Sequence, residues 1–146
     1  MSSSSPHKGV CLCGNVEFEV HGKPVTNVLC HCVNCQKSSG SSFQANYFYE
    51  AKQFTLVKGK ESITDYQDKN TDAGYTVVRS FCSNCGSNLY TINLDNPAVK
   101  DFIIVMTGCL DEQARAEFEP KQEYYCKRRQ VWCPLSPSSQ KIQAMV

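Results

Sequence analysis

The stretch FCSNCGSNLY, residues Phe81 to Tyr90, contains two cysteines in a C-x-x-C-G pattern. In such a knuckle the two thiolates face one metal ion, and the glycine that follows can adopt a positive φ that turns backbone N–H groups toward the sulfurs. A second stretch near the N-terminus, CLCGNVEF (Cys11 to Phe18), repeats the arrangement as C-x-C-G. Each stretch therefore supplies half of the ligands of a tetrahedral zinc site.

Two half-sites far apart in the chain complete one metal site and tie the N-terminal strand to the middle of the sequence. The pattern predicts a closed, structural zinc site with the ligands Cys11, Cys13, Cys82 and Cys85. The alternative is that these residues are buried free cysteines or form disulfides.

Length and charge narrow the class of protein. The 146 residues suit one domain with a hydrophobic core, and a formal net charge of +1 gives no reason to expect nucleic acid or membrane as a partner. The opening MSSSSPHKGV lacks the basic and apolar regions of a secretory signal, so we expect residues 1–8 to form a disordered leader and the protein to be cytoplasmic. In a reducing compartment, the ten closely spaced cysteines favour metal binding over disulfides.

Short runs of β-branched and aromatic residues, bounded by turn residues, predict strands at Val16–Val20, Phe43–Tyr49, Tyr75–Phe81, Leu89–Leu94 and Phe102–Thr107. Phe54–Val57 and Ser62–Tyr66 flank the turn Lys58-Gly59-Lys60 and indicate a hairpin. The acidic first turn of Asp111–Phe118 predicts a helix. We expect one mainly β domain over residues 9–134 and a loose C-terminal tail over residues 135–146.

A second cysteine cluster lies in LCHCVNCQKSSGSSF, Leu29 to Phe43. Cys30, Cys32 and Cys35 have no obvious fourth partner, and three thiolates would hold zinc with one position free for water or substrate, as in catalytic zinc sites. Such a zinc lowers the pKa of a bound thiol or water. Two alternatives stay open: His31 closes the site, or one of the remaining cysteines does, namely Cys109, Cys126 or Cys133.

The run of small residues after this cluster is a candidate substrate-binding segment. Ser39, Gly40 and Ser41 could supply backbone and hydroxyl donors to a peptide-like ligand, and Lys37 could meet a carboxylate. The same small residues are also typical of a flexible turn, and the sequence is equally compatible with a turn and with a substrate-binding segment.

Four stretches together resemble the family of glutathione-dependent formaldehyde-activating enzymes, which includes the centromere protein V type domain. They are GVCLCGNVEFEV, CHCVNCQKSSGSSF, FTLVKGKESITDY and RSFCSNCGSNLY, and the resemblance runs from Gly9 to Leu110. It implies a β-tent-like zinc-binding fold of small antiparallel sheets with one or two short helices. It also implies a structural zinc at Cys11, Cys13, Cys82 and Cys85 and a catalytic zinc at Cys30, Cys32 and Cys35.

The implied chemistry is that of a carbon–sulfur lyase or S-(hydroxymethyl)glutathione synthase, in which a thiol, typically glutathione, adds to an aldehyde or leaves the adduct. The expected partners are thus two zinc ions per chain, glutathione as co-substrate and a small carbonyl compound.

The chain departs from the family pattern at Pro120–Tyr124, where relatives carry a His-Ile pair, although Trp132 keeps the later tryptophan.

A non-catalytic zinc module that binds a protein partner is the competing hypothesis, with the aromatic FQANYFYEAKQF (Phe43 to Phe54) as an exposed patch. The two hypotheses differ at the fourth coordination position of the second zinc, which is open in an enzyme and closed in a scaffold. The oligomeric state, monomer or homodimer, is left open by the sequence.

Overall fold

The computed structural model describes residues 5–144, which form two β-sheets and two short α-helices. The small sheet contains β1 (His7–Val10), β2 (Glu17–Val20) and β5 (Phe54–Lys58) in the order β1-β2-β5. The strands of the large sheet are β3 (Thr26–Cys30), β4 (Gln44–Glu50), β6 (Ile63–Asp68), β7 (Val77–Cys82), β8 (Asn88–Asn93), β9 (Phe102–Met106), β10 (Gln122–Tyr124) and β11 (Gln140–Lys141). The helices are α1 (Val33–Ser39) and α2 (Glu112–Glu117). Four single-turn 3-10 helices lie at Ala51–Gln53, Lys60–Ser62, Thr107–Cys109 and Cys126–Arg128.

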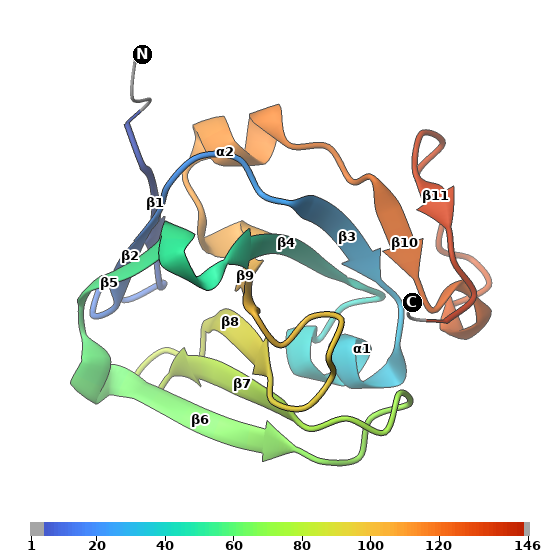
Figure 1. The fold of residues 1–146 in the computed structure, drawn as a ribbon, viewed down its shortest axis with the longest axis horizontal. Helices are drawn as coiled ribbons and strands as arrows, with labels where there is room; N and C mark the ends of the chain where they lie inside the picture. The colour runs from blue at the N-terminus through green and yellow to red at the C-terminus, as the bar shows by residue number, and fades with distance from the viewer. Residues whose placement is uncertain (1–4, 145–146) are drawn as a thin grey trace.

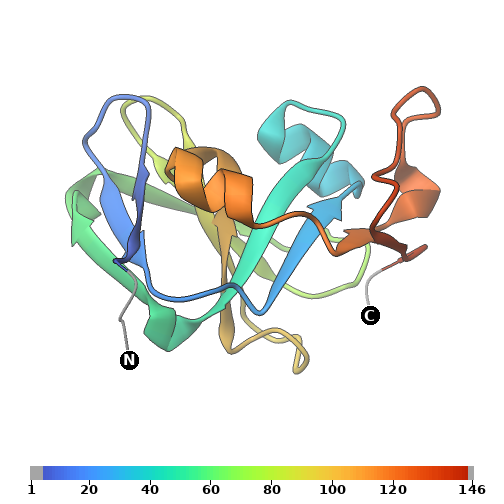
Figure 2. The same cartoon turned by 90° about the horizontal axis from the view of Figure 1, so that it is seen from above.

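The large sheet has the strand order β11-β10-β3-β4-β9-β8-β7-β6, and its pairs are antiparallel except β3–β10 and β10–β11, which are parallel. Figures 1 and 2 show the small sheet at one end of the molecule and β10 and β11 at the other. The mainly β architecture predicted from the sequence is confirmed, with two α-helices in the described part of the chain.

Side-chain alternation along β4 divides the hydrophobic core in two. Tyr47 and Tyr49 pack on one face with Phe18 of the small sheet, whereas Phe48 packs on the other face in the cluster that contains Cys30. Successive residues of a strand point to opposite faces, so β4 contributes to both cores. The hypothesis of an exposed aromatic patch at residues 43–54 is therefore wrong for Tyr47, Phe48 and Tyr49, which are at most 5% exposed.

The predicted hairpin at residues 54–66 is also wrong. β5 pairs with β2 in the small sheet and β6 pairs with β7 in the large one, so the chain crosses between sheets at Gly59. Gly59 has φ +92°, and a Cβ at this position would lie 2.0 Å from the backbone oxygen of Asn15. The turn residues signalled a change of direction correctly, but the pairing partner of each strand depends on distant residues.

Replacing Gly59 with alanine is expected to lower the free energy of unfolding by about 2–4 kcal/mol, because the positive φ is strained and the methyl group meets backbone that cannot move freely. Gly74→Ala is the matched control: Gly74 has φ +80° but nothing within 4 Å of its ideal Cβ. We expect Gly74→Ala to lower the free energy of unfolding by about 1 kcal/mol, because it adds the strain of a positive φ but no clash with neighbouring backbone. Urea unfolding midpoints measure both, and equal losses would contradict the proposed backbone clash.

The helix predicted at Asp111–Phe118 is confirmed as α2, with Asp111 as the N-cap whose side chain accepts a hydrogen bond from the Ala114 N–H at 2.9 Å. A side-chain acceptor at this position satisfies one of the free N–H groups of the first turn.

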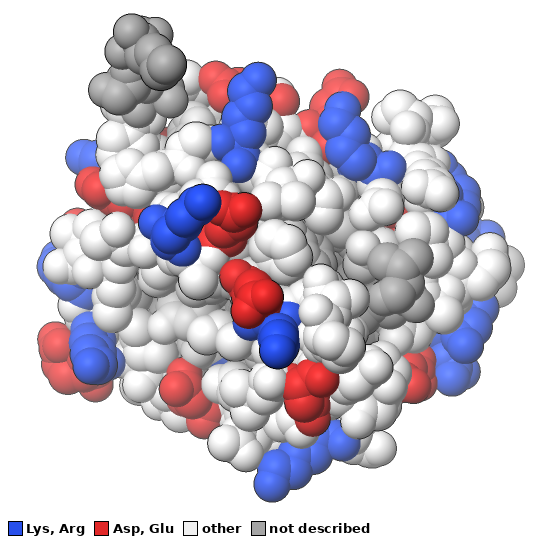
Figure 3. Space-filling view, viewed as in Figure 1, with Lys and Arg blue, Asp and Glu red and all other residues white. Residues whose placement is uncertain are grey.

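None of the helices in the described residues is long and apolar enough to cross a membrane. On the face shown in Figure 3, acidic and basic side chains are interspersed and neither sign forms a large patch.

Segments near both termini contain strands where the sequence predicted a disordered leader and a loose tail. Of the expected disordered leader, residues 1–4 lie outside the described residues, whereas His7 and Lys8 belong to β1 and pair with β2. The expected loose tail contains β11, which pairs with β10, and the Ile142 N–H donates to the Glu123 carbonyl at 2.9 Å. These backbone hydrogen bonds make the segment around β11 part of the large sheet.

Candidate metal centres and the adjoining cavities

The four cysteines of the predicted closed site come together from the β1–β2 loop and from the end of β7 with its following turn. Their sulfur atoms all lie within 4.8 Å of one another, with Cys13 Sγ 3.6 Å from Cys11 Sγ and 3.7 Å from Cys82 Sγ. Four sulfurs placed tetrahedrally around zinc at about 2.3 Å are about 3.8 Å apart. The cluster Cys11, Cys13, Cys82 and Cys85 therefore fits one zinc ion in both donor type and spacing.

Both knuckles have the backbone conformation that the C-G pattern predicts. Gly14 and Gly86 have φ +78° and +74°, and each donates its N–H to the carbonyl of the first cysteine in its motif, at 3.1 Å and 2.8 Å. The Val16 N–H donates to Cys11 Sγ at 3.3 Å. N–H groups that point at sulfur stabilise the thiolate, the form that binds a metal.

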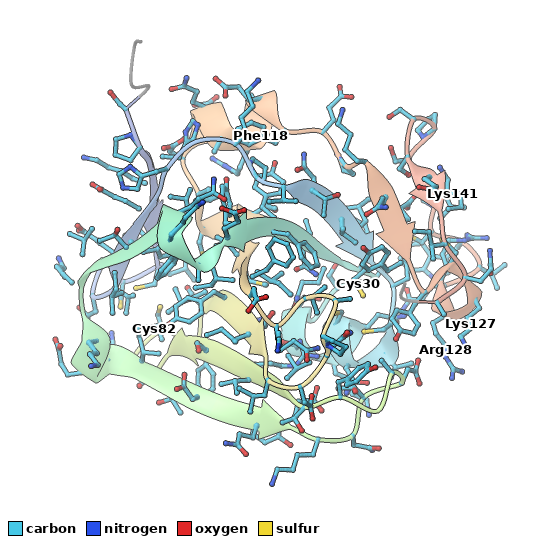
Figure 4. All side chains as sticks on the ribbon, viewed as in Figure 1. Cys30, Cys82, Phe118, Lys127, Arg128 and Lys141 are labelled. Carbon is cyan, nitrogen blue, oxygen red and sulfur yellow. The ribbon has the colours of Figure 1, made fainter. Side chains whose placement is uncertain are left out.

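The second cluster lies where β3 ends and α1 begins. Cys30 is the last residue of β3, Cys32 is the N-cap of α1 and Cys35 lies in its first turn, with the Cys35 N–H donating to Cys32 Sγ at 3.2 Å. All three are buried, and their sulfurs lie within 4.8 Å of one another. Figure 4 shows Cys30 beside α1 and Cys82 far from it, toward the small sheet, so the two clusters are separate.

The three sulfurs of this second cluster interact strongly with one another. Hydrogen bonds from Cys30 and then Cys35 lower the pKa of Cys32 to about 3, and the same contacts with Cys32 and Cys35 raise the pKa of Cys30 well above its ordinary value. Hydrogen bonding within the cluster thus favours the thiolate form of Cys32, which is the form that binds a metal. Such a group of soft donors fits zinc as well as the first cluster does.

Within residues 5–144 no fourth ligand atom from His, Cys, Asp or Glu joins this three-cysteine group. His31 points elsewhere, with Nε2 3.0 Å from the Glu123 carboxylate. The remaining cysteines interact with backbone carbonyls: Cys109 with that of Asn88, Cys126 with that of Glu123 and Cys133 with that of Pro134. Neither His31 nor any of Cys109, Cys126 and Cys133 is therefore placed as the fourth ligand of this cluster.

Glu123 links the C-terminal segment to the second cluster. Its side chain is fully buried and accepts hydrogen bonds from His31, from the Ser139 hydroxyl at 2.5 Å and from the Ser136 N–H at 3.1 Å, with Lys141 Nζ at 3.4 Å. Burial alone would raise the pKa of Glu123, but the hydrogen bonds from Ser139 and His31 hold it below its ordinary value. A buried carboxylate with these partners stays charged, and through His31 it helps fix the connection between the end of β3 and the start of α1.

Two hollows adjoin the three-cysteine cluster. A cavity of ≈ 80 Å³ is lined by all three cysteines and by the inner face of the large sheet, including Asn46 and Thr91. A larger groove of ≈ 880 Å³ runs along α1, β6 and β7. The residues that line both hollows are Asn34, Thr71, Asp72 and Arg79. The cluster therefore lies next to a groove large enough for a ligand of tripeptide size.

The residues predicted to bind substrate are placed differently from one another. Lys37 lines the groove. Ser39, Gly40 and Ser41 do not: they end α1, where Gly40 has φ +65°, the Ser39 hydroxyl donates to the Cys35 carbonyl at 2.8 Å, and the Ser41 N–H donates to Ser39 Oγ at 3.2 Å. Their hydrogen bonds close the helix, which the sequence did not reveal. Their role in substrate binding stays a prediction.

Arg79 is the main feature of the site that the sequence analysis missed. Its side chain is 11% exposed, Nε donates to Asp68 Oδ2 at 2.9 Å, and Asp68 is itself held by Asn34 Nδ2 at 2.9 Å. Successive residues of a strand point to opposite faces, so the sequence alone could have indicated that Arg79 and Phe81 lie on one face of β7. Only the tertiary structure shows that Arg79 of β7 lies beside Cys35 of α1.

The fold and its two sites define a mainly β protein with two clusters of cysteines that could hold metal ions, one of them next to a groove. The family model described as glutathione-dependent formaldehyde-activating enzyme matches residues 6–128, and the chain belongs to this family. Its fold is also similar to the crystal structure of a Rhodobacter sphaeroides protein, with a TM-score of 0.56 and 22% identity over 76% of this chain and 96% of that one. At this identity the similarity concerns the fold alone.

Proposed function

We propose that the protein is a zinc-dependent carbon–sulfur lyase or synthase that acts on the adduct of a thiol, most simply glutathione, with a carbonyl compound. The observation that carries the proposal is the three-cysteine cluster, which has no fourth protein ligand in the described residues and borders a cavity of ≈ 80 Å³. Family membership supports glutathione as the thiol.

Three thiolate donors select a soft metal, and we propose one zinc in each cluster, two per chain. When bound at Cys30, Cys32 and Cys35, zinc would hold a sulfur as thiolate or polarise a carbonyl oxygen. The protein would contribute position: the ≈ 880 Å³ groove can take the peptide part of glutathione, and Lys37 offers a cation to one of its carboxylates. The small cavity then receives the sulfur and the carbonyl group.

All ten cysteines lie in the described residues and none of them forms a disulfide. Clustered cysteines that bind metal are typical of reducing compartments, and this supports a cytoplasmic location for the proposed enzyme. Glutathione is the principal small thiol of such compartments.

Cobalt substitution tests the open coordination position. With cobalt in both clusters, adding glutathione is expected to change the thiolate-to-metal absorption band of the three-cysteine site, because its sulfur enters the free position, while the band of the four-cysteine site stays constant. S-methylglutathione, which has no free thiol, is the matched control and should leave the spectrum unchanged. If glutathione has no effect and the spectrum indicates four protein ligands at both sites, the protein is a binding module instead.

A further inference from the structure

Arg79 occupies the boundary between the cysteine cavity and the groove, since it lines both. It contacts the Cys35 side chain, and its charge is largely shielded from solvent. Asp68 engages the guanidinium through Nε, and in the described residues the two Nη atoms donate to no side-chain or backbone oxygen. A guanidinium that is held by Asp68 at Nε and lies against the Cys35 side chain is fixed in position, and it still has Nη protons that can be donated to a ligand atom.

The other arginine of the groove is arranged differently. Arg128 forms two hydrogen bonds to Asp72, from Nε at 3.1 Å and from Nη2 at 3.3 Å, and its side chain is 47% exposed. It lines the groove but not the cysteine cavity. Arg79 is therefore the arginine whose free donors can reach a group that lies against the three sulfurs.

We propose that Arg79 is a catalytic residue of the proposed reaction and that its Nη atoms donate hydrogen bonds to the carbonyl oxygen as the carbon–sulfur bond forms or breaks. The inference rests on the proposed function. With zinc bound, three thiolates would leave the centre with a net charge of about −1, which disfavours further negative charge on a nearby oxygen, and the Arg79 cation would offset this. Preorganised donors in a site shielded from water stabilise such a developing charge strongly.

The electron flow is simple in the direction of synthesis. The thiolate sulfur gives an electron pair to the carbonyl carbon, the carbon–sulfur bond forms, and the π pair of the C=O bond moves onto oxygen. That oxygen then takes a proton from water and becomes the hydroxyl of the adduct, and cleavage is the reverse. Arg79 stays protonated throughout, because the guanidinium group of arginine does not lose its proton in proteins.

The test measures exchange between glutathione and its formaldehyde adduct by exchange NMR in an equilibrium mixture of the two. Removing Arg79 alone would leave Asp68 charged and buried, so the main variant is Asp68→Asn/Arg79→Met, which removes the pair together. We expect its exchange rate to fall at least ~100-fold below that of the wild type. Circular dichroism, the metal content and the glutathione-induced change of the cobalt band should stay close to wild type, because the proposed role is in the transition state and not in binding.

Arg115→Met is the matched control, with an exchange rate within about threefold of wild type, since Arg115 is exposed on α2 and lines neither the cysteine cavity nor the groove. Asp68→Asn alone, which keeps the guanidinium but loosens it, should give an intermediate rate. Added guanidinium ion should partly restore exchange to Arg79→Ala but not to Cys32→Ser.

The proposal is overturned if the paired variant exchanges as fast as Arg115→Met, or if it loses the metal at the three-cysteine site, which would make Arg79 structural. If the paired variant does not fold, Arg79→Lys, which keeps the charge opposite Asp68, decides the matter: we expect at least a ~10-fold lower rate, and full activity would refute a role for the planar fork. A wild-type protein that neither accelerates exchange nor responds to glutathione contradicts the proposed function itself, a result distinct from all of these.

Discussion

Cys11→Ser is expected to unfold or aggregate the protein. Cys11 is buried against the core, and with Cys13 it joins the β1–β2 loop to Cys82 and Cys85. Cys82 lies 69 positions after Cys13 in the sequence. The binding free energy of a structural zinc is on the order of 10–16 kcal/mol, comparable to or larger than the whole stability of a domain, roughly 5–15 kcal/mol. Serine is a poor zinc ligand, so most of this stabilisation is lost with one sulfur.

The measurements are circular dichroism, soluble yield and zinc content of the purified variant. Cys109→Ser is the matched control, because Cys109 is half-buried near the same cluster and donates to the Asn88 carbonyl, a hydrogen bond that a serine hydroxyl can also make. We expect this control to change the free energy of unfolding by about 1 kcal/mol or less. A Cys11→Ser protein that unfolds at the same urea concentration as Cys109→Ser would show that the four-cysteine cluster is not a structural metal site.

Cys32→Ser is expected to abolish activity while leaving the fold largely intact. Cys32 is the N-cap of α1 and accepts the Cys35 N–H, and serine is among the best N-cap residues, so the helix should keep its start. The loss of one of three sulfurs should nevertheless empty the second site. Zinc should fall from about two to about one per chain. Glutathione–formaldehyde exchange should fall by at least ~1,000-fold, because several catalytic effects of the metal are lost together.

Elemental analysis, circular dichroism and exchange NMR distinguish this outcome from simple unfolding. Cys126→Ser is the control: it lies close to the same region, its thiol contacts the Glu123 carbonyl, and it is not part of the cluster. This control should retain two zinc ions and full activity. Full activity in Cys32→Ser would show that the three-cysteine cluster is not the site of reaction.

Features that depend on neighbours in the chain were predictable from the sequence. The C-x-C-G and C-x-x-C-G motifs predicted the positive φ of Gly14 and Gly86, and the acidic start of residues 111–118 predicted α2. The grouping of the cysteines into sets of four and three also followed from their spacing, because ligands two or three residues apart converge on one ion in most backbone conformations. Within each motif the controlling interactions span only a few residues.

The tertiary structure alone decided which distant groups meet. It paired β5 with β2 instead of β6, placed the charged Glu123 in a buried contact with His31, and brought Arg79 of β7 beside Cys35 of α1. Strand pairing and the burial of charged side chains result from contacts between residues far apart in sequence, and no local pattern distinguishes a solvated arginine or glutamate from a buried one. The sequence by itself therefore determined the two cysteine clusters and the class of fold, whereas packing determined the surroundings of those clusters.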